Sequence, residues 1–89
     1  MRFSPGSLYI TPGAQDACRA SGEPPLEFLF RHLAGDWGSV GAEDAQENEY
    51  SLIHGLRILS SYTLNNGVKL FVITEADRSA TTILRADEY

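Results

Sequence analysis

The chain has 89 residues, a formal net charge of −5 and an apolar fraction of 43%, which predicts a single globular domain over residues 1–89. Phosphate contacts need clustered Lys and Arg, but Lys69 is the only lysine, so the charge disfavours a nucleic-acid partner. Cys18 is the only cysteine, which excludes an internal disulfide and Cys-rich zinc sites. No stretch approaches the ~18 apolar residues of a membrane span. We therefore expect a cytoplasmic protein without a membrane anchor, metal or cofactor.

The first half of the chain predicts one short strand and then helices. Residues 7–11 alternate as a strand does. Thr11-Pro12 then starts a helix that Gly22 ends. Pro24-Pro25 restarts the chain, and a second helix follows until Gly35. Its apolar residues recur at i, i+3, i+4 and i+7, which predicts the buried face Leu26, Leu29, Phe30 and Leu33.

A third helix is predicted from Ala42 to His54. Its first turn is acidic, which favours the helix dipole. The expected buried stripe contains Ala45, Leu52 and Ile53. Glu49 lies within that stripe, so we expect its carboxylate to find a partner or to lie beside a cavity.

The second half predicts three strands, over residues 56–64, 68–74 and 80–84. Asn66-Gly67 is a strong hairpin signal between the first two, and residues 75–79 form the second turn. The element order predicts an α+β fold: a short N-terminal strand, three helices and a three-stranded antiparallel meander with the helices on one face.

The Asn66-Gly67 turn also predicts a register, in which Ser60 lies opposite Ile73 and Tyr62 opposite Phe71. The same register separates the polar side chains between the two faces of the sheet. Ser60, Tyr62 and Glu75 share one face with Ile58 and Ile73. Arg57, Leu59, Ser61 and Thr74 share the other.

Two polar segments, Arg31–Gly38 and Thr74–Leu84, end regular elements and are the candidate functional loops. We expect them to meet at one end of the sheet. In the first segment, His32 is a candidate general base, and Asp36 either orients it or caps a turn. Trp37 either closes the core or stacks on a ligand.

The second segment places two carboxylates, a guanidinium and hydroxyls within six residues. Glu75 is a candidate for proton transfer and Arg78 for phosphate binding. Asp77 is a further binding candidate, or it satisfies the backbone of its own turn. Arg57 lies at the start of the first predicted strand of the meander, at the same sheet end.

Residues 31–38 (RHLAGDWG) and 74–84 (TEADRSATTIL), with Gly55-Leu56-Arg57 and Ser60–Tyr62 between them, resemble a family of small proteins from bacterial plasmids and integrative elements. The resemblance covers nearly the whole chain. Members are sometimes labelled type I restriction modification subunits. That label does not fit, because a methyltransferase needs a much longer cofactor-binding domain. The resemblance implies a mobile-element context but no activity.

Three functions remain open at this stage. The first is a non-enzymatic accessory protein that binds a protein partner through the sheet end and the turn at residues 35–38. A homodimer is an additional expectation, since the core is small. The second is a small nuclease or hydrolase that uses His32, Glu75 and Arg78, since the element order resembles that of barnase- and RelE-like ribonucleases. The third is a DNA mimic that uses the carboxylates of residues 43–49.

Overall fold

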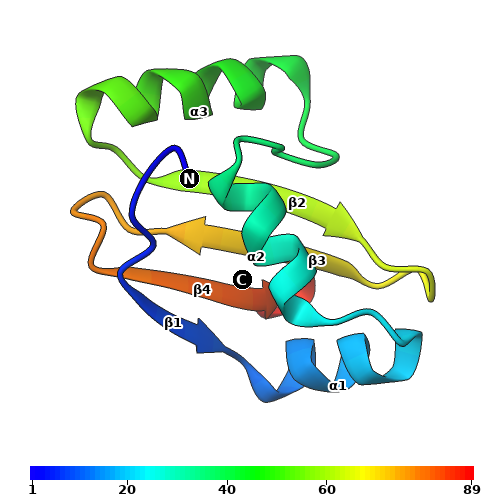
Figure 1. Ribbon diagram of the computed structural model, residues 1–89. Helices are drawn as coiled ribbons and strands as arrows, with labels where there is room; N and C mark the ends of the chain where they lie inside the picture. The colour runs from blue at the N-terminus through cyan, green and yellow to red at the C-terminus, as the bar shows by residue number, and fades with distance from the viewer.

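The computed structural model describes all 89 residues, and it has the predicted α+β class with three helices and a four-stranded sheet (Figure 1). Every predicted helix and strand is present, and strand ends differ by at most two residues. A short 3-10 helix, η1, follows the last strand. The elements are β1 (Ser7–Ile10), α1 (Pro12–Ser21), α2 (Pro25–Leu33), α3 (Ala42–His54), β2 (Ile58–Thr63), β3 (Lys69–Thr74), β4 (Ala80–Arg85) and η1 (Ala86–Glu88).

The sheet is mixed, in the order β1-β4-β3-β2. β2, β3 and β4 form the predicted three-stranded antiparallel meander, but the prediction did not include the parallel pairing of β1 with β4. β1 joins the sheet as an edge strand parallel to β4, with Leu8 opposite Thr81 and Ile10 opposite Ile83. A parallel pair needs a long crossover, and here the chain between β1 and β4 provides it. Turn residues mark hairpins in a sequence, but no local pattern marks a pair this far apart.

The β2–β3 hairpin lies one residue away from the predicted register. Ser60 lies opposite Val72 instead of Ile73. A shift of one residue moves side chains to the other face of the sheet. Thr74 therefore faces the helices together with Ser60, and Ile73 lies on the outer face beside Leu59.

The hairpin loop explains this shift. A two-residue turn at Asn66-Gly67 would need positive φ at both residues. Only Gly67 has it, at 84°, so the loop holds three residues, as in hairpins with a left-handed glycine at the last loop position. Tyr62 accordingly lies opposite Leu70 and not opposite Phe71.

The main core lies between one face of the sheet and helices α1 and α2. In Figure 1, α2 crosses that face and α1 lies at the corner of the sheet beyond the end of β1. Thr11 caps α1 by accepting a hydrogen bond from the Ala14 backbone at 3.1 Å, and Gly22 ends the helix in a left-handed conformation. Both were predicted. Cys18, on α1, is buried in this core. No helix combines the length and the apolar character that crossing a membrane requires.

The buried face of α2 differs from the predicted one. Phe28, Leu29, His32 and Leu33 are buried, whereas Leu26 and Phe30 are mostly exposed. The sequence predicted the buried face from apolar spacing alone, at Leu26, Leu29, Phe30 and Leu33. The sheet, however, contacts the neighbouring side of the helix, which includes His32. This leaves α2 with apolar side chains on its exposed side as well.

Helix α3 lies along the β2 edge of the sheet and not over its face (Figure 1). Its buried residues are polar, Asn48 and Ser51, and Ile53 is 79% exposed. The predicted stripe is therefore wrong at Ile53. The Asn48 amide donates to the Leu59 carbonyl at 2.7 Å and accepts from the Leu59 N–H at 3.1 Å. Polar pairing with the strand edge, rather than apolar packing, thus positions α3.

Candidate functional site

The two polar segments meet only at His32, whereas the turn at residues 35–38 lies beside Ser61 and Tyr62 on β2 and not at the predicted sheet end. The His32 imidazole Nε2 lies 2.9 Å from the Thr74 hydroxyl, and its Nδ1 lies 2.6 Å from the Ser60 hydroxyl. All three side chains are fully buried. Helix α2 supplies the imidazole, while neighbouring strands β2 and β3 supply the hydroxyls from the helix-facing side of the sheet.

The donor and the acceptor of each hydrogen bond around His32 can be assigned, starting from the Pro5 carbonyl. The Thr81 hydroxyl donates to the Pro5 carbonyl, which can only accept, at 2.8 Å. Thr81 therefore accepts from the Thr74 hydroxyl at 2.7 Å, and Thr74 accepts from the imidazole. His32 then carries its proton on Nε2, and Nδ1 accepts from the Ser60 hydroxyl. We refer to these side chains, Ser60, His32, Thr74 and Thr81, as the buried polar chain.

His32 is closed to a substrate. Burial lowers the pKa of His32 to about 4, so the imidazole is neutral at neutral pH. Both ring nitrogens are occupied within the buried polar chain. The rings of Phe3 and Trp37 lie edge-on to the imidazole, with centroids 5.2 Å and 5.9 Å away. A general base must reach the proton that it abstracts, and this imidazole has no free position for one.

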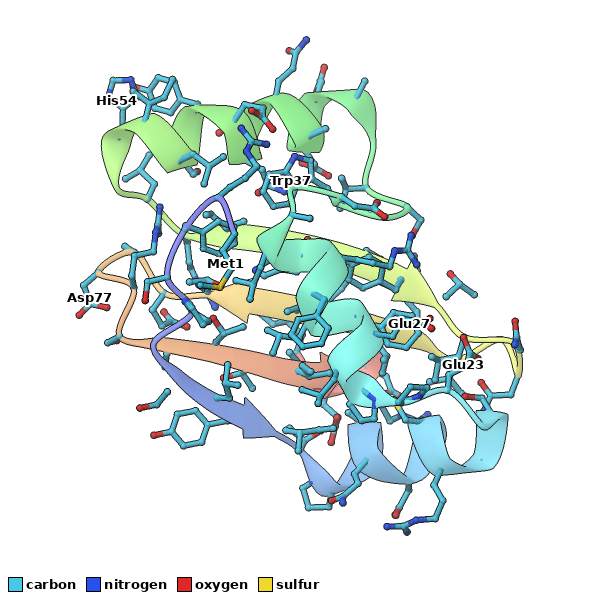
Figure 2. All side chains as sticks on the ribbon, viewed as in Figure 1. Met1, Glu23, Glu27, Trp37, His54 and Asp77 are labelled. Carbon is cyan, nitrogen blue, oxygen red and sulfur yellow. The ribbon has the colours of Figure 1, made fainter.

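Trp37 closes the core and does not form an open stacking surface. It is 7% exposed and lies between α3 and the sheet in Figure 2. Its indole N–H donates to the Glu49 carboxylate at 3.0 Å, and Arg2 donates to the same carboxylate at 2.7 Å and 2.9 Å. Hydrogen bonds from Arg2 and Trp37 lower the pKa of Glu49 to about 2. Glu49 thus has the partner that its position on α3 required.

Asp36 caps its turn and does not orient His32. Its carboxylate accepts from the Gly38 N–H at 3.1 Å and from the Arg31 guanidinium at 2.7 Å, and the bond from Arg31 holds the pKa of Asp36 below its usual value. The Tyr62 hydroxyl donates to the Asp36 carbonyl at 2.6 Å. The turn that carries Trp37 is therefore fixed from both sides.

Arg78 ties the β3–β4 turn to the end of α3. Its backbone is left-handed, at φ 61°, and its guanidinium donates to four carbonyls. These belong to Ser51, Leu56, Glu75 and Ala76, at 2.6–3.1 Å. With these bonds in place, Arg78 is used as a structural clamp and does not present its donors to a phosphate.

The two acidic residues of the β3–β4 turn, Glu75 and Asp77, also have local partners. Asp77 accepts from the Ser79 N–H at 3.0 Å, and hydrogen bonds from Ser79 lower the pKa of Asp77. The carboxylate of Glu75 lies 3.6 Å from the Arg57 guanidinium. The three residues of the nuclease hypothesis, His32, Glu75 and Arg78, therefore have separate partners and form no shared open site.

An open groove lies on the other side of the sheet, between α3 and the outer face of β2 and β3. Its volume is about 590 Å³. Asp44 and Glu47 line it from α3, and residues 39–41 line the end near the Trp37 turn. We refer to it as the outer groove.

Arg57 is the one predicted binding residue that lines the outer groove. Its guanidinium donates to the Tyr89 hydroxyl at 3.1 Å and lies 5.7 Å from the centre of the Tyr89 ring. The Tyr89 ring in turn packs edge-on against Phe71, with centroids 5.6 Å apart. The sequence prediction missed Phe71 and Tyr89, because the outer face of the sheet could be identified only with the correct register.

The roles of Ser60, Thr74 and Thr81 were also missed. Each is a hydroxyl residue in an otherwise apolar strand, and this pattern could have indicated a buried polar partner for His32. No group of three or more His, Cys, Asp or Glu side chains is arranged to hold a metal ion. No known family model, curated protein or solved structure matches this chain.

Proposed function

We propose that this protein is a non-enzymatic accessory protein of bacterial mobile elements that acts by binding a protein partner in the outer groove. The observation that carries the proposal is the open cluster of Arg57, Phe71 and Tyr89 in a groove of about 590 Å³. The mobile-element context rests on the resemblance of the polar motifs, and the cytoplasm remains the expected compartment.

The residue types in the outer groove favour a protein as the ligand. Arg and aromatic side chains dominate the binding energy at protein interfaces, usually inside a polar rim. Here Arg57 and Tyr89 are mutually oriented by a hydrogen bond, so little side-chain freedom is lost when they are covered. Asp44 and Glu47 on one wall and Lys69 on the other supply the charged rim.

The position of the groove also fits the proposed mode of binding. It begins at the sheet end that carries Arg57 and extends to residues 39–41, directly after the Trp37 turn. The sheet end and this turn are the two features that the sequence pointed to. The Arg78 clamp then has a supporting role, because it fixes the C-terminal end of α3 and hence one wall of the groove.

Neither alternative function has comparable support. The nuclease hypothesis needs an accessible base, and His32 is neutral and enclosed. The DNA-mimic hypothesis needs an uninterrupted row of carboxylates, and Glu49 is turned toward Arg2 and paired with it. Protein binding in the outer groove, in contrast, relies on side chains such as Arg57 and Tyr89 that are exposed to a partner.

The test uses a partner recovered from the native host with the wild-type protein as bait. We expect Arg57→Ala and Tyr89→Ala to weaken its binding by at least about tenfold, as truncation of a hot-spot residue does. Ile53→Ala is the matched control, since Ile53 is exposed on α3 and does not line the groove. Tyr89→Phe isolates the hydroxyl bond to Arg57. Equal binding by all variants would reject the outer groove as the binding site.

A further inference from the structure

We infer that the free edge of β1 is the interface of a symmetric dimer, in which two copies of the chain pair their β1 strands antiparallel. The inference concerns the edge of the sheet opposite to α3 and is independent of the proposed function.

The two edges of the sheet are treated differently by the fold. On the β2 edge, Asn48 bonds to both backbone groups of Leu59. Further along, the Ser61 N–H donates to the Trp37 carbonyl at 3.1 Å, and the Ser39 N–H donates to the Ser61 carbonyl at 2.7 Å. The β2 edge is therefore closed by the chain itself. β1 forms the opposite edge, which no other element covers in Figure 1.

The hydrogen bonds of β1 show which backbone groups are free. The Ser7 N–H donates to the Ser79 carbonyl and the Thr11 N–H to the Ile83 carbonyl, both at 3.0 Å. Backbone groups alternate in direction along a strand, so residues 7, 9 and 11 bond toward β4. The N–H and carbonyl groups of Leu8 and Ile10 then point outward, and no other group in the protein bonds to them. An uncovered edge of this kind is a template for another strand.

These free groups allow one antiparallel register between two copies. With the two-fold axis at Tyr9, Leu8 pairs with Ile10 of the second copy and Ile10 with Leu8 of the second copy, and each pair exchanges two hydrogen bonds. A shift in one direction would bring in Gly6, whose φ of 65° is not extended. A shift in the other direction would bring in Pro12, which has no N–H to donate. The edge is therefore self-complementary only about Tyr9.

Apolar side chains surround this edge. Leu8, Tyr9 and Leu26 are 52–59% exposed, and all three line a groove of about 250 Å³ between β1 and α2. At roughly 200 Å² for a large side chain, these three exposed fractions offer roughly 330 Å² per chain. With the strand backbone and the second copy added, the total falls in the class of weak, transient interfaces, below about 1,200 Å². The dimer is accordingly weak, with a Kd on the order of 10–100 μM.

The charge distribution permits this association despite the net charge of −5. No residue of β1 is charged. The acidic helix α3 lies beyond β2, three strand positions away from β1. At about 4.8 Å per strand this is ~14 Å, well beyond the ~8 Å Debye length at physiological salt. The two acidic helices of a dimer are farther apart still, at the outer ends of the joined sheet.

The same features predict a closed dimer and not a filament. Each copy has one free edge, β1, which is fully paired in the dimer. Asn48 and the Trp37 turn already cover the β2 edge. Pro5 and Pro12 flank the strand, which limits the length that can pair. The outer groove stays open in both copies, so the dimer carries two identical binding grooves.

The test combines sedimentation with a register-specific crosslink. Sedimentation velocity of the full chain from ~10 μM to ~1 mM brackets the expected Kd and should show a reversible monomer–dimer equilibrium. Tyr9→Lys places like charges opposite each other and should abolish the dimer, whereas Ile53→Lys adds the same charge on exposed α3 and should not. Far-UV circular dichroism checks that both variants remain folded.

The crosslink distinguishes the predicted register from other contacts. In this register the two Tyr9 Cα atoms lie about 4.5 Å apart, within the range that a disulfide spans. Under mild oxidation Tyr9→Cys should form a linked dimer at least tenfold faster than Ser7→Cys, whose counterpart is Thr11. The buried Cys18 is common to both. A chain that stays monomeric at every concentration, equal loss of dimer in the two Lys variants, or equal rates for the two Cys variants would overturn the inference. Each of these results would leave the outer-groove proposal standing.

Discussion

Replacing His32 with Gln should remove an acid-sensitive part of the stability of this fold. His32 is fully buried and neutral, and burial lowers its pKa to about 4 from an ordinary value of 6.5. Between these two values the unfolded chain binds a proton at this residue and the folded chain does not. Stability that depends on the neutral imidazole is thus complete above pH 6.5 and is lost as the pH falls toward 4.

The size of this effect follows from the two pKa values. Each pH unit between them changes the free energy of unfolding by at most about 1.4 kcal/mol, so the loss from pH 6.5 to pH 4 is about 3 kcal/mol. A small domain has about 5–15 kcal/mol of stability in total. The protein should therefore become markedly easier to denature at pH 4.5 than at pH 7.5.

The pH window separates His32 from the paired carboxylates. Glu49 also has a shifted pKa, lowered to about 2 from 4.5, and its contribution is lost only as the pH falls below about 4.5. Asp36 and Asp77 have ordinary pKa values of 3.8 that the fold lowers further. Any steep loss of stability between pH 6.5 and 4.5 therefore reports on the imidazole.

Urea denaturation followed by the fluorescence of Trp37 measures this directly, since Trp37 is the only tryptophan and contacts the imidazole. We expect the free energy of unfolding of the wild type to fall between pH 6.5 and 4.5, and that of His32→Gln to stay nearly level. His54→Gln, at the exposed end of α3, should keep the wild-type slope. If wild type and His32→Gln show the same slope, the assignment of a neutral buried imidazole is wrong.

Three further predictions concern the contacts that hold α3 and its flanking turns, all measured by urea denaturation at pH 7.5. Asn48→Ala leaves both backbone groups of Leu59 without a partner and should cost about 1–3 kcal/mol, and Asn48→Asp, which cannot donate, should not restore it. Arg78→Ala removes the clamp on four carbonyls and should cost a similar amount, with Arg78→Lys only partly tolerated. Gly38→Ala forces a Cβ into the Ser61 carbonyl at a φ of 73° and should cost more than about 2 kcal/mol, whereas Gly41→Ala, with open space around it, should be nearly neutral.

The local parts of the fold could be predicted from the sequence. Thr11, Pro12 and Gly22 delimit α1 because capping and backbone conformation depend on single residues. The strands follow from alternation, and their ends agree within two residues. The contacts between segments that are distant in the chain could not be predicted. Examples are the parallel contact between β1 and β4 and the side of α2 that faces the sheet.

A single local conformation accounts for the largest error in the predicted site. Asn66 can adopt a left-handed conformation, and its pairing with Gly67 favours a two-residue turn. Asn66 instead has negative φ, and the register moves by one residue. This change places Thr74 beside His32 and moves Ile73 to the outer face. The sequence allowed both loops, and the packing of Tyr62, Val72 and Leu70 against the helices selects between them.

The candidate site could be located from the sequence more readily than it could be interpreted. The segments at residues 31–38 and 74–84 do meet through His32 and Thr74, yet their other polar side chains bond within their own segment or to other parts of the fold. Charged and hydroxyl groups in a loop satisfy either the backbone of that loop or a ligand, and sequence does not separate the two. The bonds of Arg78 to four carbonyls settle the question for this residue, because a donor engaged in the fold is not offered to a partner.

The same polar contacts explain why a small domain can keep an open groove on the outer face of its sheet. Helix α3 contributes no residue to the main hydrophobic core, so apolar burial alone would not hold it beside β2. Asn48 fixes its middle to the strand edge, Arg78 fixes its C-terminal end, and Glu49 joins it to Arg2 and Trp37. Directional bonds hold a helix at a distance from the sheet face, whereas an apolar stripe would draw it onto that face. The groove therefore exists because α3 is attached by hydrogen bonds along one edge, and Arg78, a catalytic candidate in the sequence, is one of the residues that hold it there.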